Sequence, residues 1–439
     1  MLKMGCAKID VTPDFPVYQR GYGARNQKTV LVENPVEAGV IALEQDGRRF
    51  LLITADLVGV PYRNCRIIYE RLKQEFGIGW PEVVISASHT HFAPGFGPYV
   101  ITFSGGALER GVYLPDDEYF EFWFAKLRIA VRAALADLEE VTLSSAAVPV
   151  SGIAYNRRLI RKSDGVVQTH YTLPENLDDY DFSPIDETFH IWRFNKGNRP
   201  KALLGRYGCH PVTGGAEYYG ISADYPGCFK QCVQNEFGCP GFFWLGTAGD
   251  VVPMRRNGHS RQDLGEILTR AIRLNELNFR AENDFILDAT GFTLHGTPVM
   301  VLDHGRREEL LQAAFAAAAQ SAEPYNAALS ETAQRYLVTS RYPQSGYDIP
   351  IQLLRLGGKV AVFIPFEVFT DIGLALRKAC PEAVIVSISG GHEGYLPLQS
   401  DFALGGYETQ FGATFAPDTG DRLLAACVEE IGNFQSRNL

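Results

Sequence analysis

Two histidines at alternate positions are the clearest sign of chemistry in this sequence. His89 and His91 lie in the run Ser-His-Thr-His at residues 88–91, shortly after an apolar run at residues 83–85. Side chains of an extended strand repeat every two residues, so both imidazoles would lie on one side of the chain. Paired imidazoles at the end of a buried strand are typical of a metal site. Taken alone, the motif is equally compatible with chance.

Three segments of the chain share one order of elements: a strand hairpin, a helix and a further strand. They cover residues 38–91, 189–245 and 351–388, and each shows apolar strands around a Gly-containing turn before its helical segment. The alternative is coincidence, because this order is common in proteins. Coincidence is a weaker explanation for the polar residues that follow corresponding strands in the three segments.

Polar side chains follow the strands of all three segments. In α/β folds, sites form beyond the carboxyl ends of strands, so we expect these side chains to surround one cleft. The residues after the second strands are Asp56, His210 and Glu367, and those after the third strands are His89, His91, Asp250 and Tyr395.

The composition predicts a globular α/β protein. The 439 residues are 46% hydrophobic and 21% charged. We expect one domain, residues 1–439, with β-sheets packed between helical layers. Helical segments at 119–138, 262–274, 306–319 and 420–431 would cover the sheets. Two excursions, residues 92–120 and 152–187, fall outside the repeats, and the first would be a loop or lid beside the site.

The charge balance and the cysteines limit the partners and the compartment. A net charge of −10 argues against nucleic acid. No signal peptide or membrane-spanning run is visible, so we expect no stable membrane insertion and a cytoplasmic location. The eight cysteines are then expected to be reduced. The sequence gives no indication of the oligomeric state.

Several short blocks, in order and spacing, resemble the catalytic domain of the neutral (non-lysosomal) ceramidase family. The resemblance extends from residue 5 almost to the C-terminus. No single block decides it, but together they are specific. The blocks are residues 5–13, 54–56, 88–95, 156–157, 208–211, 249–250, 365–367, 394–397 and 407–408. His392 and Glu393 directly precede one block and could line the pocket.

The resemblance implies a zinc ion, Zn²⁺, and roles for individual residues. Its ligands would be His89, His210, Glu367 and Tyr395. His91 and Arg157 fall on positions that contact the substrate or transition state, and Tyr407 on a substrate-side tyrosine. We count Asp250 among the catalytic residues with His91, Arg157 and Tyr407, and expect that it and Asp56 accept hydrogen bonds behind the ligands, as carboxylates near metal sites commonly do. These assignments suit the chemistry, because zinc takes nitrogen and oxygen donors in fours and lowers the pKa of bound water to about 7.

Each of these residues also has a structural interpretation. His210 could cap a strand, and Glu367 could sit in the first turn of a helix, where a carboxylate is favourable. Tyr395 and Tyr407 could be core aromatics.

The sequence departs from the family at the proposed nucleophile. In ceramidases the Gly-Asp motif continues into Ser-Pro, and that serine has been assigned as nucleophile, whereas Val252 stands here. We also expect no counterpart of the β-sandwich domain that follows the catalytic domain in ceramidases. We therefore expect a zinc-dependent hydrolase that uses metal-bound water on a small or medium polar substrate, an amide, ester or glycoside.

Two alternatives remain open. One is a lipid amidase that hydrolyses N-acylsphingosine, and the other is a zinc-dependent lyase, isomerase or binding protein. The partner would be a small molecule or a glycan- or lipid-derived substrate.

Overall fold

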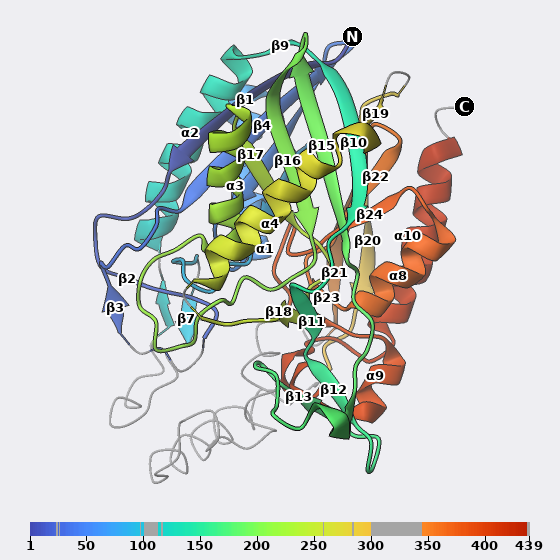
Figure 1. Cartoon of the computed structure of the whole chain (residues 1–439). Helices are drawn as coiled ribbons and strands as arrows, with labels where there is room; N and C mark the ends of the chain where they lie inside the picture. The colour runs from blue at the N-terminus through green and yellow to red at the C-terminus, as the bar shows by residue number, and fades with distance from the viewer. Residues whose placement is uncertain are drawn as a thin grey trace.

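Three β-sheets dominate the computed structural model of the chain (Figure 1). The structure describes residues 1–22, 25, 27–96, 98–100, 113–115, 117–257, 259–282, 285–299 and 345–436. The helix predicted at 306–319 and the middle of the predicted lid, residues 101–112, lie outside the described residues.

Each sheet contains one of the three predicted repeats. In every repeat two strands form an antiparallel hairpin, a helix follows, and the last strand pairs in parallel with the second strand of the hairpin. The first repeat comprises β4 (Glu37–Gln45), β5 (Arg48–Ala55), α1 (Tyr62–Phe76) and β6 (Val83–Ala87). The second comprises β15 (Thr188–Lys196), β16 (Arg199–Tyr207), α3 (Asp224–Phe237) and β17 (Gly241–Leu245). The third comprises β21 (Tyr347–Leu356), β22 (Lys359–Phe363), α8 (Thr370–Ala379) and β24 (Ala383–Val386).

A further antiparallel strand extends each hairpin on its other side, which the sequence did not predict. These strands are β1 (Lys3–Asp10), β10 (Thr142–Pro149) and β20 (Asp288–Gly296). The short strands are β2 (Val17–Tyr18), β3 (Lys28–Thr29), β7 (Pro98–Val100), β8 (Tyr113–Pro115), β9 (Glu139–Glu140), β11 (Ala154–Asn156), β12 (Arg158–Arg161), β13 (Val167–Thr169), β14 (Tyr180–Asp181), β18 (Val251–Pro253), β19 (Arg280–Ala281), β23 (Glu367–Val368) and β25 (Tyr395–Leu396).

The inner faces of the three sheets share one apolar core. Alternate residues of a strand point to opposite faces, so Leu52 of β5 joins this core while Leu51 and Ile53 face the helices. The core has a tryptophan at its centre: the ring of Trp244 lies 5.5 Å from Trp192 in its own sheet and 5.2 Å from Phe363 in the third. The sheets are therefore packed against one another directly.

Helices cover the outer faces in pairs, which confirms the predicted α/β architecture. Besides α1, α3 and α8, the covering helices are α2 (Asp117–Ala136), α4 (Ser260–Leu274) and α10 (Thr419–Ser436), with the short helix α9 (Gln399–Leu404) near the C-terminus. Helix α1 buries Cys65, Ile68 and Leu72, spaced to share one helical face. None of the helices in the described ranges is long and apolar enough to cross a membrane.

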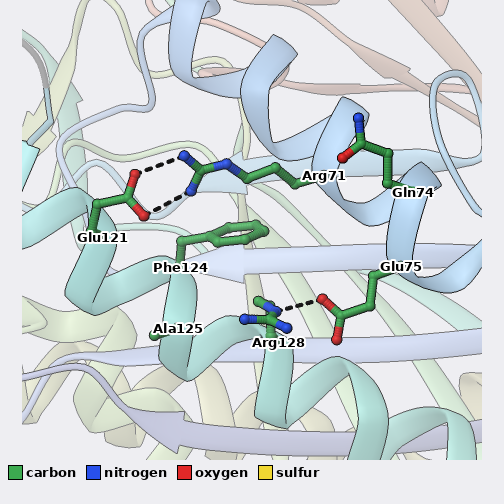
Figure 2. A pocket seen from close by; sticks show the side chains of 7 residues that line it. All are labelled: Arg71, Gln74, Glu75, Glu121, Phe124, Ala125 and Arg128. Carbon is green, nitrogen blue, oxygen red and sulfur yellow. Dashed lines mark hydrogen bonds and ion pairs between the residues drawn. The ribbon is translucent and has the colours of Figure 1, made fainter.

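A surface hollow of about 460 Å³ lies between α1 and α2 (Figure 2). Arg71 of α1 binds both carboxylate oxygens of Glu121 at 2.8 Å, and Arg128 pairs with Glu75. Exposed ion pairs of this kind contribute only about 0–1 kcal/mol each. None of the predicted site residues lines this hollow, which we interpret as the seam between two covering helices.

The carboxyl ends of the three parallel strands meet. The Ser387 amide, just beyond β24, donates to the Leu245 carbonyl at the end of β17 (2.9 Å). The Ala87 amide, at the end of β6, donates to the Ile388 carbonyl (3.0 Å). Backbone hydrogen bonds thus join all three repeats where the sequence placed the functional residues.

Replacing Trp244 by alanine should destabilise the protein by about 3–5 kcal/mol, the usual range for deleting a buried aromatic side chain. Trp244 is fully buried where two sheets meet, so the cavity would weaken both. Guanidinium denaturation followed by circular dichroism measures the loss. The predicted single domain requires one cooperative transition, and separate transitions for the repeats would contradict it.

Candidate metal centre

The run at residues 88–91 leaves the end of β6 as a turn, not as the extended segment that we expected. His89 has a left-handed backbone (φ 67°), and its amide donates to the Leu57 carbonyl at 2.9 Å. This conformation is uncommon for residues other than glycine and costs free energy that the surrounding structure must supply. The two imidazoles still meet, with 3.3 Å between their Nε2 atoms.

One side chain from each repeat contributes a possible metal-ligand atom, and the three atoms lie close together. His89 comes from the first repeat, His210 from the second and Glu367 from the third. The Nε2 atom of His89 lies 3.1 Å from Nε2 of His210 and 3.3 Å from Oε2 of Glu367, and the His210–Glu367 distance is 3.1 Å. All three side chains are buried, with at most 7% of a residue exposed.

Two of the histidines are held so that their Nε2 lone pairs face each other. The Nδ1 atom of His89 contacts the Val58 carbonyl, and Nδ1 of His210 contacts the Ala248 carbonyl. A carbonyl only accepts, so each Nδ1 carries the proton and a neutral ring then has an unprotonated Nε2. Two lone pairs and a carboxylate oxygen at these distances repel one another unless a cation lies between them.

The spacing of the donors fits a zinc ion. Tetrahedral ligands about 2.0–2.1 Å from zinc lie about 3.3 Å from one another. The observed separations of 3.1–3.3 Å match this value. Carbonyl partners on the outer nitrogens are also the usual support for metal-binding histidines.

The charge states suit a cation as well. Burial, helped by the nearby Arg157 guanidinium, lowers the pKa of His210 to about 4. Burial raises the pKa of Glu367, but positive charge on the side that faces His89 holds it well below its usual range, and a cation bound between the neutral rings would supply that charge. Metal ligands must be deprotonated to bind, and neutral imidazole with ionised carboxylate meets that condition.

His91 belongs to the cluster but is held differently. Its ligand nitrogen lies near those of His89 and His210, yet its buried Nδ1 has no hydrogen-bond partner among the described residues. The Tyr22 ring packs against its imidazole at 4.9 Å, and a Cβ at Gly21 would lie 2.4 Å from it. His89 and His210 are thus held by backbone carbonyls, whereas the His91 ring is held by packing against Tyr22 and Gly21.

Tyr395 lies beside Glu367, because β25 pairs with β23 in parallel and these two residues are in register. Its ring lies 6.4 Å from that of His210. Its hydroxyl accepts a hydrogen bond from Nη2 of Arg157 at 2.9 Å. Zinc ligation by Tyr395 stays a prediction.

Arg157 is fixed by a buried network. Its Nε donates to Glu408 at 2.6 Å, and its Nη2 also donates to the Gly249 carbonyl at 2.9 Å. Arg158 binds the other oxygen of Glu408. Only Nη1 of Arg157 lacks a hydrogen-bond partner within the described part of the chain. The network joins the excursion at 152–187 to the C-terminal segment.

The two aspartates lie behind the centre. Asp250 accepts hydrogen bonds from Asn156 at 2.6 Å and from the amide and hydroxyl of Thr370 at 3.0 and 2.9 Å. Asp56 pairs with Lys230 at 2.6 Å. Both carboxylates are therefore occupied in holding neighbouring segments together.

Two half-exposed tyrosines lie on the solvent side of this network. Tyr407 and Tyr171 are each 42% exposed, and their rings are 6.4 Å apart. Tyr407 lies 6.0 Å from Tyr395, and the Arg157 guanidinium lies over the Tyr171 ring. The sequence pointed to Tyr407, but it offered no signal for Tyr171, which lies in the irregular excursion.

Val252, at the position of the family serine, is fully buried in a small apolar cluster. It is in register with Tyr155 across β11 and β18, and Leu159 and Val212 complete the cluster. No hydroxyl is available at this position.

Three helix-covered sheets with a buried histidine–carboxylate centre at their joined strand ends define the class of this fold. It is the fold of the neutral ceramidases, as the sequence resemblance predicted. Neutral ceramidase from Pseudomonas aeruginosa superimposes with a TM-score of 0.74 at 18% identity, over 97% of this chain and 73% of that chain. A structure of ceramidase complexed with C2 superimposes with a TM-score of 0.74 at 16% sequence identity, over 99% of this chain and 75% of that chain. No family model and no curated protein sequence matches the chain.

Proposed function

We propose that this chain is a zinc-dependent amidase that hydrolyses N-acyl lipid amides of the ceramide type. The observation that carries the proposal is the cluster of His89, His210 and Glu367, whose ligand atoms have zinc-site spacing. The ceramidase fold over almost the whole chain supports the lipid amide. It favours this alternative over the small polar substrate that the sequence placed first.

The zinc site would be formed by His89, His210 and Glu367, with Tyr395 as the fourth ligand. A zinc ion bound there would supply Lewis acidity and lower the pKa of water to about 7. The chain itself excludes bulk water from the reacting atoms, because all four side chains are at least nine-tenths buried.

His91 would act on the substrate. Without a carbonyl anchor at Nδ1, its neutral ring can carry the proton on Nε2. That N–H can donate to the carbonyl oxygen of the amide as negative charge develops on it. Arg157, with Asp250 behind it, keeps Tyr395 in place and has Nη1 left for a polar substrate group. Tyr407 and Tyr171 would flank the substrate.

Purified protein should contain about one equivalent of zinc and hydrolyse N-acylsphingosine to fatty acid and sphingosine. Chelation should abolish hydrolysis, and zinc should restore it. Activity only on polar amides, esters or glycosides would favour the first hypothesis from the sequence. Conversion without incorporation of ¹⁸O from labelled water would indicate a lyase or isomerase.

Replacing Val252 by alanine should leave zinc content unchanged and turnover within a few-fold of wild type. The side chain is apolar and fully buried in a cluster with Tyr155, Leu159 and Val212, so it contributes packing and no chemistry. Steady-state kinetics and metal analysis test this. Inactivation of the wild type by a serine-directed covalent inhibitor would contradict the serine-independent reaction.

A further inference from the structure

His392 contacts the oxygen of Glu367 that faces away from the other donors. Its Nε2 lies 3.3 Å from Oε1, whereas Oε2 faces His89 and His210. The His392 ring also packs edge-on against the His89 ring, with centroids 5.5 Å apart. Its side chain is 24% exposed, so it lies on the solvent side of a cluster that is otherwise closed.

The chain makes room for this ring and fixes its backbone. A Cβ at Gly59 would lie 2.4 Å from the imidazole, so only glycine leaves the space that the ring fills. On either side of His392, Gly390 and Gly394 have positive φ angles of 70° and 84°, which glycine adopts at little cost. The Glu393 amide donates to the Pro365 carbonyl at 2.7 Å, close to Glu367 in the chain.

The other two donors each have an outer partner, Val58 for His89 and Ala248 for His210. We propose that His392 is the corresponding positioning residue for Glu367. By donating from Nε2 to Oε1, it holds the carboxylate so that Oε2 points at the metal. A carboxylate without this partner could rotate about its terminal torsion and would lose that orientation. The inference rests on the proposed metal site and assigns a residue to it that the family resemblance does not include.

Metal affinity measured with a chromophoric chelator tests this directly and needs no substrate. His392→Ala should weaken zinc binding about 10–100-fold, the usual cost of removing an outer partner of a ligand. His392→Gln keeps an N–H donor at a similar reach and should restore affinity to within a few-fold of wild type. His259→Ala, at an exposed histidine preceding α4, is the matched control and should bind zinc as wild type does.

Cobalt substitution separates positioning from direct ligation. The visible absorption of the cobalt-loaded His392→Gln protein should keep the wild-type band shape and intensity, because the ligand set is unchanged. Wild-type affinity in His392→Ala would overturn the inference. So would a glutamine variant as weak as the alanine variant, or a changed cobalt spectrum. Failure of the wild type itself to bind zinc would instead overturn the proposed function.

Discussion

A protein with alanine in place of His210 should contain no zinc and should not hydrolyse the substrate. His210 is fully buried, and its Nε2 lies 3.1 Å from both His89 Nε2 and Glu367 Oε2. Removing it deletes the donor that the second repeat contributes. Affinity should therefore fall by more than the roughly 10–100-fold that loss of an outer partner costs.

Metal analysis of protein purified without added zinc measures this effect. His259→Ala should retain about one equivalent and serves as control. Circular dichroism of the apo proteins establishes that the His210 variant is folded, since the change also leaves a small cavity. One equivalent of tightly bound zinc in folded His210→Ala protein would contradict the assignment of the centre.

The second large effect is expected at His91. His91→Ala should lower turnover by about 10²–10⁴-fold, the usual cost of losing a general acid or base, while zinc remains bound. The reason is the difference at Nδ1: His89 and His210 are anchored by carbonyls, and His91 is not. Zinc content and kcat, measured on the same preparation, test both parts together.

Arg157→Ala provides a comparison for the His91 variant. It should also keep its zinc and lose turnover, because Arg157 holds the Tyr395 hydroxyl at 2.9 Å and is proposed to contact the substrate through Nη1. Loss of zinc in His91→Ala would mean that His91 is a ligand, and our division of roles between His89 and His91 would be wrong. Unchanged turnover would remove His91 from the reaction.

The sequence predicted the repeats because their signals are local. Hairpins, helices and strands each leave a pattern within about ten residues, as in the helical spacing of Cys65, Ile68 and Leu72. Strand ends then pointed to His89, His210 and Glu367. The sequence could predict that these three converge because sites in α/β folds form beyond the carboxyl ends of strands, although each of the three follows a strand of a different sheet.

Contacts between distant segments left no such pattern. Tyr22 packs on His91 from the N-terminal loop, and Glu408 binds Arg157 across 251 positions of the chain. The left-handed backbone of His89 also has no local signal, since only a small fraction of histidines adopt it. These features depend on how the sheets pack, which periodicity within a single element does not specify.

The hydrogen bonds that join the three strand ends have a thermodynamic consequence. Each repeat contributes one of the three central donors, so no single repeat contains a binding site. The ion would bind only the fully assembled chain, and its binding free energy would be added to the stability of the junction between repeats. Cofactor content would then report on the completeness of folding, and scarcity of the ion would remove its stabilising contribution from the junction formed at Leu245 and Ile388.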